Sequence, residues 1–395
     1  MTLHTPASES DACALVSEAA ARRAPLAVAG AGTKAAFGRP AQTEATLSSR
    51  GLTGITLYEP AELVVAARAG TPLAEVEAAL AAKGQELSFE PLDYRGLLGS
   101  SGEPTIGAVA AMNLSGPRRI MAGAARDSLI GVRFVNGRGE AVKSGGRVMK
   151  NVTGLDLVKL MAGSHGTLGF LTEVTFKVLP KPERIATLSF PGLDDAKGIE
   201  VLSQALGSPF EVTGAAHLPA AVTGEGARTL IRIEGFGSSV DYRLGELRRL
   251  LKRAGAPELV EGDAAAALWR QVRDAAFLVE PRDAAVWRLS TAPTRAPALV
   301  DAIAARLDAR WFYDWGGGLV WLACPATGDV GAAAIREALR PVGGHATLVR
   351  APVEVRAAVD VFEPLDSALM RITSGIKASF DPAGVLNPGR MYAGI

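Results

Sequence analysis

The sequence predicts an α+β protein of two domains, in which the end of the chain returns to the first domain. Glycine-rich loops are gathered in the first half, strand and helix patterns alternate in the second half, and turn-forming residues return in the last twenty residues. The 395 residues suffice for two or three domains, and 48% hydrophobic with 21% charged residues is ordinary for a globular chain. We expect domains over residues 1–183 and 184–375, followed by a return segment over 376–395.

The composition argues against several classes of protein. With 42 Lys and Arg against 41 Asp and Glu, the formal charge is +1, so the chain has no positive field to hold a nucleic-acid backbone. No uncharged stretch reaches the roughly 20 apolar residues that a membrane-spanning helix needs. The first twenty residues lack a basic start followed by an apolar run, so we expect no secretory signal and a cytoplasmic location.

Cysteines and histidines are too few and too scattered for metal chemistry. The two cysteines, Cys13 and Cys324, lie far apart, which excludes a disulfide framework and an iron–sulfur cluster held by this chain alone. No two of the four histidines have the short spacing that is typical of a metal site. We therefore predict no metal.

The first glycine loop follows a short apolar strand predicted over residues 26–29. Two glycines directly after a strand allow successive backbone N–H groups to converge on an anion, so this loop is a candidate phosphate site. The alternative is a plain tight turn, because the loop lacks Gly-Lys-Ser/Thr and the third glycine of the common nucleotide-binding patterns. Its residues are Gly30, Ala31, Gly32, Thr33 and Lys34.

A second glycine stretch, residues 105–116, has no charged side chain. Its small residues allow close approach of the backbone to a ligand, and the amide of Asn113 can both donate and accept. The alternative is a Gly/Ala-rich helix packed tightly against a sheet. A polar pair then precedes the strand predicted over 129–136. The candidate binding residues of this part are Thr105, Ile106, Gly107, Ala108, Asn113, Gly116, Arg126 and Asp127.

The third glycine cluster opens onto a strand predicted over residues 170–179, and the turn-rich end of the chain supplies a fourth polar motif. The candidates in the cluster are Gly163, Gly166, Gly169 and Phe170. At the chain end, Asn387 and Arg390 offer an amide and a cation to a bound ring. The alternative is that Asn387-Pro388-Gly389 simply forms a terminal turn.

In the second half, the same order of elements, a strand, a helix and then further strands, occurs twice. Such a pattern favours an antiparallel sheet with helices on one face. Strands are predicted over residues 185–190, 212–217, 229–234, 286–290, 311–313, 319–323 and 347–350, and helices over 194–206, 239–254, 295–309 and a stretch ending at 339.

These polar and glycine-rich motifs, in this order, resemble the flavoproteins of the vanillyl-alcohol oxidase type, whose FAD domain has the p-cresol methylhydroxylase fold. Residues 30–34 and 105–116 are similar to that family's two pyrophosphate loops, Arg126-Asp127 to its adenine-side turn, 163–173 to its Gly-Ser-x-Gly-Thr-Leu-Gly block, and 386–390 to its flavin-edge motif. The resemblance implies a two-part FAD-binding domain followed by an antiparallel, ferredoxin-like α+β cap domain.

Within that family, residues 147–154 and 380–392 most resemble the FAD-binding E subunits of bacterial glycolate oxidases. This resemblance implies a subunit of a multi-subunit enzyme that converts glycolate to glyoxylate. The implied partners are a sister FAD-containing catalytic subunit and an iron–sulfur subunit, through which the complex could also associate with the membrane. The small 2-hydroxy acid would be handled at the level of the complex.

The resemblance also bears on the chemistry of this chain. Covalent members carry His at the position of Thr33 or a Cys in the second flavin loop, so we expect non-covalent FAD. Members that oxidise 2-hydroxy acids alone have closely spaced histidines in the second half, where this chain has only the isolated His217 and His345. No catalytic residue is therefore assigned. Two alternatives stay open: a self-sufficient, D-lactate-like 2-hydroxy-acid dehydrogenase, and a redox-silent FAD-containing scaffold.

Overall fold

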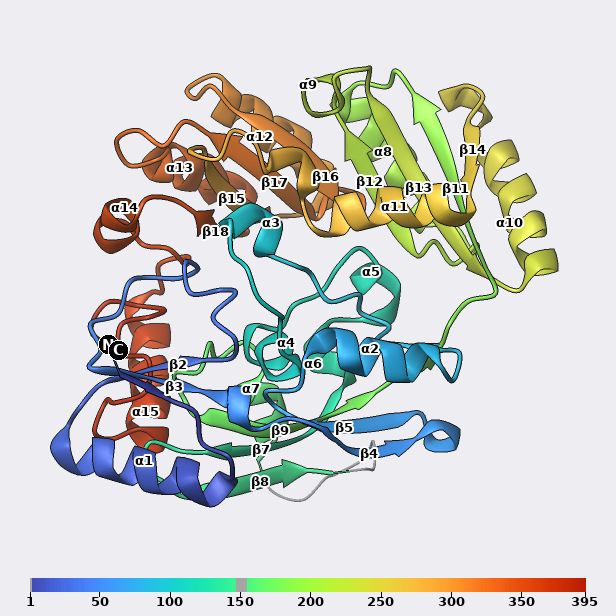
Figure 1. Cartoon of the computed structure of the whole chain (residues 1–395). Coiled ribbons are helices and arrows are strands. Elements are labelled where there is room, and N and C mark those ends of the chain that lie inside the picture. The colour runs from blue at the N-terminus through green and yellow to red at the C-terminus, as the bar shows by residue number, and fades with distance from the viewer. Residues whose placement is uncertain (1, 147–154) are drawn as a thin grey trace.

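The computed structural model describes residues 2–146 and 155–395, which form two domains (Figure 1). The chain from β1 (Thr2–His4) to β10 (Leu179–Pro180) forms the first domain, in the lower half of Figure 1, with α15 (Ser367–Phe380) packed beside it. The second domain runs from β11 (Arg184–Pro191) to β18 (His345–Arg350). The segment 147–154, which resembles glycolate oxidase E subunits, lies outside the described residues.

The first part of the first domain is a small parallel sheet of β1, β3 (Ala45–Ser48) and β2 (Leu26–Ala29), in that order. Helix α1 (Glu9–Arg22) covers it, beginning at a capping box in which the Ser8 hydroxyl and the Asp11 carboxylate each accept a backbone N–H. Apolar residues of α1, β2 and β3 share one core with Leu386 near the chain end. The first glycine loop therefore starts from a sheet that the C-terminus helps to build.

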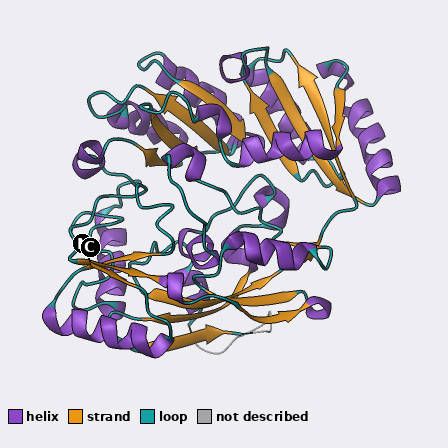
Figure 2. Cartoon of the chain, in the orientation of Figure 1, coloured by secondary structure: helices purple, strands orange, loops and turns teal. Residues whose placement is uncertain are grey.

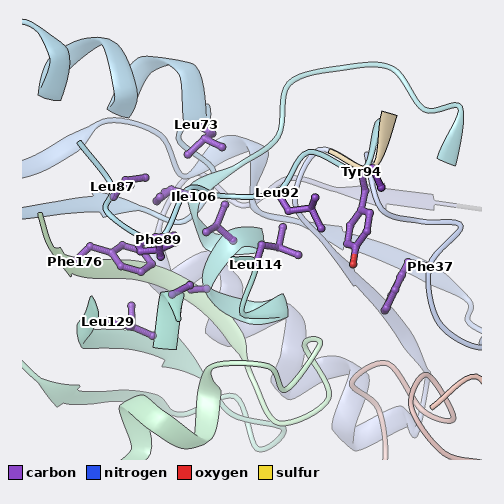
Figure 3. Packing of buried hydrophobic residues seen from close by; sticks show 14 of the residues in the cluster. Phe37, Leu73, Leu87, Phe89, Leu92, Tyr94, Ile106, Leu114, Leu129 and Phe176 are labelled. Atoms are coloured by element: carbon purple, nitrogen blue, oxygen red, sulfur yellow. The ribbon is translucent and has the colours of Figure 1, made fainter. Parts of the chain in front are cut away.

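The second part of this domain is an antiparallel sheet in the order β4-β5-β9-β7-β8. Its central strands are mostly buried, and helices cover one side of the sheet. Figure 3 shows Leu129 and Phe176 from this sheet packed against Phe89 and Ile106 from the covering layer. The strands are β4 (Ile55–Glu59), β5 (Val64–Arg68), β9 (Phe170–Lys177), β7 (Leu129–Val135) and β8 (Ala141–Gly145); the other elements are α2 (Leu73–Ala81), β6 (Gln85–Glu86), α3 (Arg95–Leu98), α4 (Ile106–Met112), α5 (Arg119–Ala122), α6 (Ala125–Ser128) and α7 (Leu157–Met161).

The second domain is one eight-stranded antiparallel sheet in the order β14-β11-β13-β12-β16-β17-β15-β18. It consists of two β-α-β-β-α-β units, each with its second and third strands adjacent and its first and fourth strands adjacent, which is the ferredoxin-like arrangement. The two units join where β12 pairs with β16 at His217 and Tyr313. The units comprise β11, α8 (Asp195–Leu206), β12 (Gly214–Leu218), β13 (Arg228–Gly235), α10 (Gly237–Leu250) and β14 (Glu258–Glu261), then β15 (Ala285–Ser290), α12 (Ala296–Ala304), β16 (Arg310–Asp314), β17 (Leu319–Cys324), α13 (Ala332–Val342) and β18.

The two faces of this sheet belong to different cores. Along β17, Val320 and Leu322 pack with helices α8, α10, α12 and α13, whereas Leu319 and Trp321 belong to the core shared with the first domain. Helix α11 (Gly262–Arg273) also contributes to that shared core. The expectation of helices on one face is thus correct for four helices and wrong for α11, whose apolar side packs on the face toward the first domain. Figure 2 shows that loops, in teal, gather where the two domains meet.

Three segments differ from the elements expected from the sequence. Strand β14 and helix α11 lie in a stretch where we expected no element, although α11 has an amphipathic pattern with Trp269 on its buried side. Helix α15 begins at Ser367, so the expected boundary at residue 376 falls inside a helix. The short helices α9 (Ala220–Thr223) and α14 (Val353–Ala358) complete the fold. We propose that the return segment begins with α15.

Candidate cofactor-binding site

A cavity of about 760 Å³, partly open to solvent, lies where the first glycine loop, the start of α4, the third glycine cluster and the chain end meet. Twelve of the residues predicted from the sequence line it: Gly30, Ala31, Gly32, Thr33, Lys34, Gly107, Ala108, Gly166, Gly169, Phe170, Asn387 and Arg390. The structure thus brings together motifs that are far apart in the sequence.

The backbone of the first loop is arranged to receive an anion. Its carbonyl groups are bound from outside the loop, since the Ser48 hydroxyl donates to Gly30 O (2.7 Å) and the Ser100 hydroxyl to Thr33 O (2.6 Å). Within the described residues, the backbone N–H groups of residues 31–34 have no acceptor. Gly32 has φ +80°, and a Cβ there would enter open space. The loop therefore fits a pyrophosphate by means of free N–H groups.

Lys34 adds a buried cation to this loop. Its ammonium group donates to the Thr33 hydroxyl at 3.2 Å, and its side chain is only 8% exposed. Burial lowers the pKa of Lys34 to about 8, against a smaller opposing effect of Asp93. The group thus still carries a positive charge at pH 7. A bound phosphate would favour this charged form and would compensate its desolvation.

The second glycine stretch forms helix α4, which is the alternative that the sequence left open. Thr105 caps the helix through its hydroxyl, and Ile106 points into the core (Figure 3). A Cβ on Gly107 would lie 2.6 Å from the Ala69 Cβ, so glycine is needed for the contact between α4 and the residue that follows β5. Gly107 and Ala108 nevertheless line the cavity from the first turn of the helix. The segment thus packs tightly on the sheet and also faces the cavity, and its role in binding stays a prediction.

The structure does not bring seven predicted residues to the cavity. The side chain of Asn113 accepts the Arg126 N–H at 2.8 Å, and Asp127 accepts the Ala124 N–H at 2.8 Å, so these polar groups stabilise turns of the chain. Gly116 accepts a hydrogen bond from Trp315 of the second domain. The seven residues outside the cavity lining are Thr105, Ile106, Asn113, Gly116, Arg126, Asp127 and Gly163.

Asn387 joins the first loop's strand to the third cluster. Its side-chain oxygen accepts the Val28 N–H (2.8 Å), and its amide N–H₂ donates to the carbonyls of His165 (2.8 Å) and Val28 (3.3 Å). The amide is therefore fully used within the protein, in agreement with the alternative of a terminal turn. Arg390 differs, because one guanidinium nitrogen binds the Lys34 and Ala35 carbonyls and the rest of the fork has no partner among the described residues.

Two aromatic residues of the lining were missed by sequence reasoning. The rings of Phe37 and His165 stack with their centroids 5.6 Å apart and an angle of 8° between planes. Burial, together with the nearby Arg390, lowers the pKa of His165 to about 3, so this imidazole is neutral at physiological pH. His165 could have been found from its place inside the third cluster. Nothing in the sequence around Phe37 indicates that it reaches the cavity.

A buried ion pair fastens the chain end to this site. The Lys377 ammonium contacts the Asp381 carboxylate at 2.6 Å and donates to the carbonyls of Thr167 (2.8 Å) and Leu386 (2.7 Å). Asp381 in turn accepts the N–H groups of Val385 and Leu386. The third glycine cluster and the terminal turn are therefore held by one charged network.

Comparison with known proteins agrees with this geometry. Residues 2–145 match the family described as FAD binding domain. The glycolate oxidase subunit GlcE of Escherichia coli (strain K12) is 37% identical over 380 residues, which cover 96% of this chain and 95% of that protein. The chain belongs to the GlcE family. The glycolate oxidase subunit GlcD of Bacillus subtilis (strain 168) is 29% identical over 330 residues, 73% of this chain and 68% of its own length.

Solved structures confirm the fold predicted from the sequence. The structure of p-cresol methylhydroxylase with substrate bound superposes with a TM-score of 0.73 at 15% identity, covering 98% of this chain and 88% of that one. FAD is the cofactor that this family membership supports. Over residues 2–146 and 155–395, no helix combines the length and the apolar character that crossing a bilayer requires. No cluster of three or more potential ligand side chains for a metal occurs in the same residues.

Proposed function

We propose that this chain is the FAD-binding subunit of a multi-subunit glycolate oxidase or dehydrogenase that converts glycolate to glyoxylate. The observation that supports this most is the 37% identity to GlcE over nearly the whole of both chains. The cavity supports it independently, because its loop offers free N–H groups and a buried lysine to a pyrophosphate. We also propose that FAD is held without a covalent bond, since Thr33 stands where covalent members carry histidine.

The residues that line the cavity have distinct roles in the proposed binding of FAD. The N–H groups of residues 31–34 bind the pyrophosphate, and Lys34 supplies the opposing charge. FAD, when bound, supplies the two-electron acceptor that oxidation of a hydroxy acid needs. The aromatic pair Phe37 and His165 excludes water from one wall of the site. Arg390 holds the first loop through the Lys34 and Ala35 carbonyls and keeps a cation beside it.

We further propose that the sister flavoprotein and an iron–sulfur subunit complete the enzyme. Both cysteines are unsuited to carrying electrons onward, because they are separate free thiols and, among the described residues, belong to no cluster that could hold a metal. The histidines of the second domain are separated, since His217 lies in the sheet core bonded to Thr229 and Asp195, whereas His345 is at the exposed start of β18. A partner must therefore supply the proton acceptor and the outlet for electrons.

Co-expression tests this proposal. The chain produced with its neighbouring flavoprotein and iron–sulfur subunits should purify as a stable hetero-oligomer that reduces a dye in the presence of glycolate. The chain produced alone should bind FAD but show no glycolate-dependent or D-lactate-dependent dye reduction. Rapid turnover by the isolated chain would contradict the proposal and would support the self-sufficient dehydrogenase, and an FAD-loaded complex inactive with every 2-hydroxy acid would support the scaffold.

A further inference from the structure

Two arginines from different domains each lie over the ring of one tryptophan. Arg119 of α5, in the first domain, lies 4.5 Å from the centroid of the Trp315 ring, and Arg288 of β15, in the second domain, lies 4.9 Å from it. Cation–π contacts of this kind hold a planar guanidinium over a ring and leave its N–H edge free to bind. The three side chains therefore form a stack that crosses the domain interface.

The backbone at Trp315 is strained to hold this stack. Trp315 has φ +52°, a left-handed conformation that is rare for a bulky residue, and Gly316 and Gly317 continue with positive φ. The indole N–H donates to Gly116 O at 3.1 Å, and the Asp314 carboxylate accepts the Trp315 N–H at 2.7 Å. The ring is thus fixed from both domains, which is typical of a residue whose position matters for binding.

Neither guanidinium of the stack is neutralised by direct contact, although the carboxylates of Asp127, near Arg119, and Asp314, near Arg288, act on them at longer range. Among the described residues, Arg119 and Arg288 form no side-chain hydrogen bond and no ion pair. Burial lowers the pKa of both groups, and for Arg119 the charge of Arg288 lowers it further. Elsewhere at the same interface, by contrast, Arg232 binds Glu90 through two hydrogen bonds of 2.8 and 2.9 Å. The interface thus pairs one buried arginine directly with a carboxylate and leaves two arginines without a directly bonded counter-ion.

We propose that the Arg119–Trp315–Arg288 stack is the binding site of a small carboxylate of the 2-hydroxy acid class, with both guanidiniums directed at the carboxylate. Guanidinium and carboxylate match as a bidentate pair, and a negative charge in direct contact would compensate desolvation that the nearby carboxylates offset only from a distance. The choice of glycolate-like acids rests on the proposed function.

The surroundings of the stack favour a small ligand near the cofactor cavity. Tyr94 stacks on Phe37, which lines that cavity, at 5.5 Å between centroids, and its phenol also interacts with the charge of Arg288. The carboxyl group beside the stack, Asp314, is buried and has its pKa raised to about 7, so at neutral pH it offsets only part of the positive charge. A half-buried position between two domains suits a small anion better than the surface of a partner subunit.

Titration calorimetry of the FAD-loaded chain with glycolate tests the proposal, using Arg119→Gln, Arg288→Gln and, as a control, Arg306→Gln in the exposed pair with Glu337. Each of the first two changes should weaken glycolate binding by about tenfold or more, because each removes a charge-assisted hydrogen bond. Arg288→Lys should give an intermediate loss. FAD content should stay unchanged, and the unfolding midpoint should stay level or rise because a desolvated charge is removed.

Three results would overturn the proposal that this stack binds a small carboxylate. These are undetectable glycolate binding by the unaltered chain, affinity that is the same in both glutamine variants, or binding of inorganic phosphate with no binding of glycolate or acetate. A lowered unfolding midpoint with unaltered glycolate affinity would show that the arginines are structural. Because the titration needs no partner subunit, each of these results leaves the test of the proposed function by co-expression intact.

Discussion

Gly32→Asp is expected to weaken FAD binding by on the order of 100-fold, since even about 3 kcal/mol of repulsion between a carboxylate and a neighbouring pyrophosphate gives that loss. Gly32 lies in the loop whose N–H groups are free. A Cβ added at this position would have no other atom within 4 Å. The added charge would therefore enter the cavity without disturbing the core. Flavin content of the purified protein and a titration of the flavin-free chain with FAD measure the effect.

The matched control for this experiment is Gly32→Asn. Asparagine has the same shape as aspartate and tolerates the positive φ of this position, but it carries no charge. We expect Gly32→Asn to retain most of the FAD. Equal loss in both variants would show that the backbone conformation, and not the charge, is limiting. Gly107→Asp is unsuitable as a second test, because its Cβ would collide with Ala69 and change the packing of α4.

Asp381→Ala is expected to lower the free energy of unfolding of the first domain by about 3–5 kcal/mol, the usual loss when one member of a buried ion pair is removed. Lys377 would remain buried with two carbonyl partners and no counter-charge. Both side chains of the pair are almost inaccessible, at 8% and 0% exposure, so water cannot replace the lost carboxylate. Urea unfolding followed by circular dichroism measures the loss.

Glu200→Ala provides the comparison for this stability experiment. Its ion pair with Lys197 has a similar length, 2.8 Å, but both side chains are exposed. An exposed pair contributes only about 0–1 kcal/mol, so this variant should unfold close to the unaltered protein. Similar small losses in Asp381→Ala and Glu200→Ala would contradict the anchoring role of the buried pair.

The sequence predicted the site best where backbone conformation limits the residue type. Gly30 and Gly166 mark positions where a Cβ would contact Thr105 or Asn387, and such constraints appear directly as glycines in the sequence. Polar side chains were predicted less well. Asn113 and Asp127 satisfy local backbone N–H groups, and a local hydrogen bond has the same sequence signature as a ligand contact.

Some contacts between distant segments could not be predicted from the sequence. Phe37 reaches the cavity because Tyr94 and His165 stack on it, and these residues come together only in the folded chain. The alternation of strands and helices predicted an antiparallel sheet, but not that its second face would join the core of the first domain. That arrangement depends on the packing of Trp321 and Trp269, which periodicity alone does not reveal.

Acid precipitation of the purified chain tests the central claim, a single non-covalent FAD in the cavity formed by the first loop. The supernatant should contain close to one FAD per chain, and the pellet should be colourless. A protein that purifies without flavin and does not bind added FAD, or a pellet that keeps its yellow colour, would contradict the account.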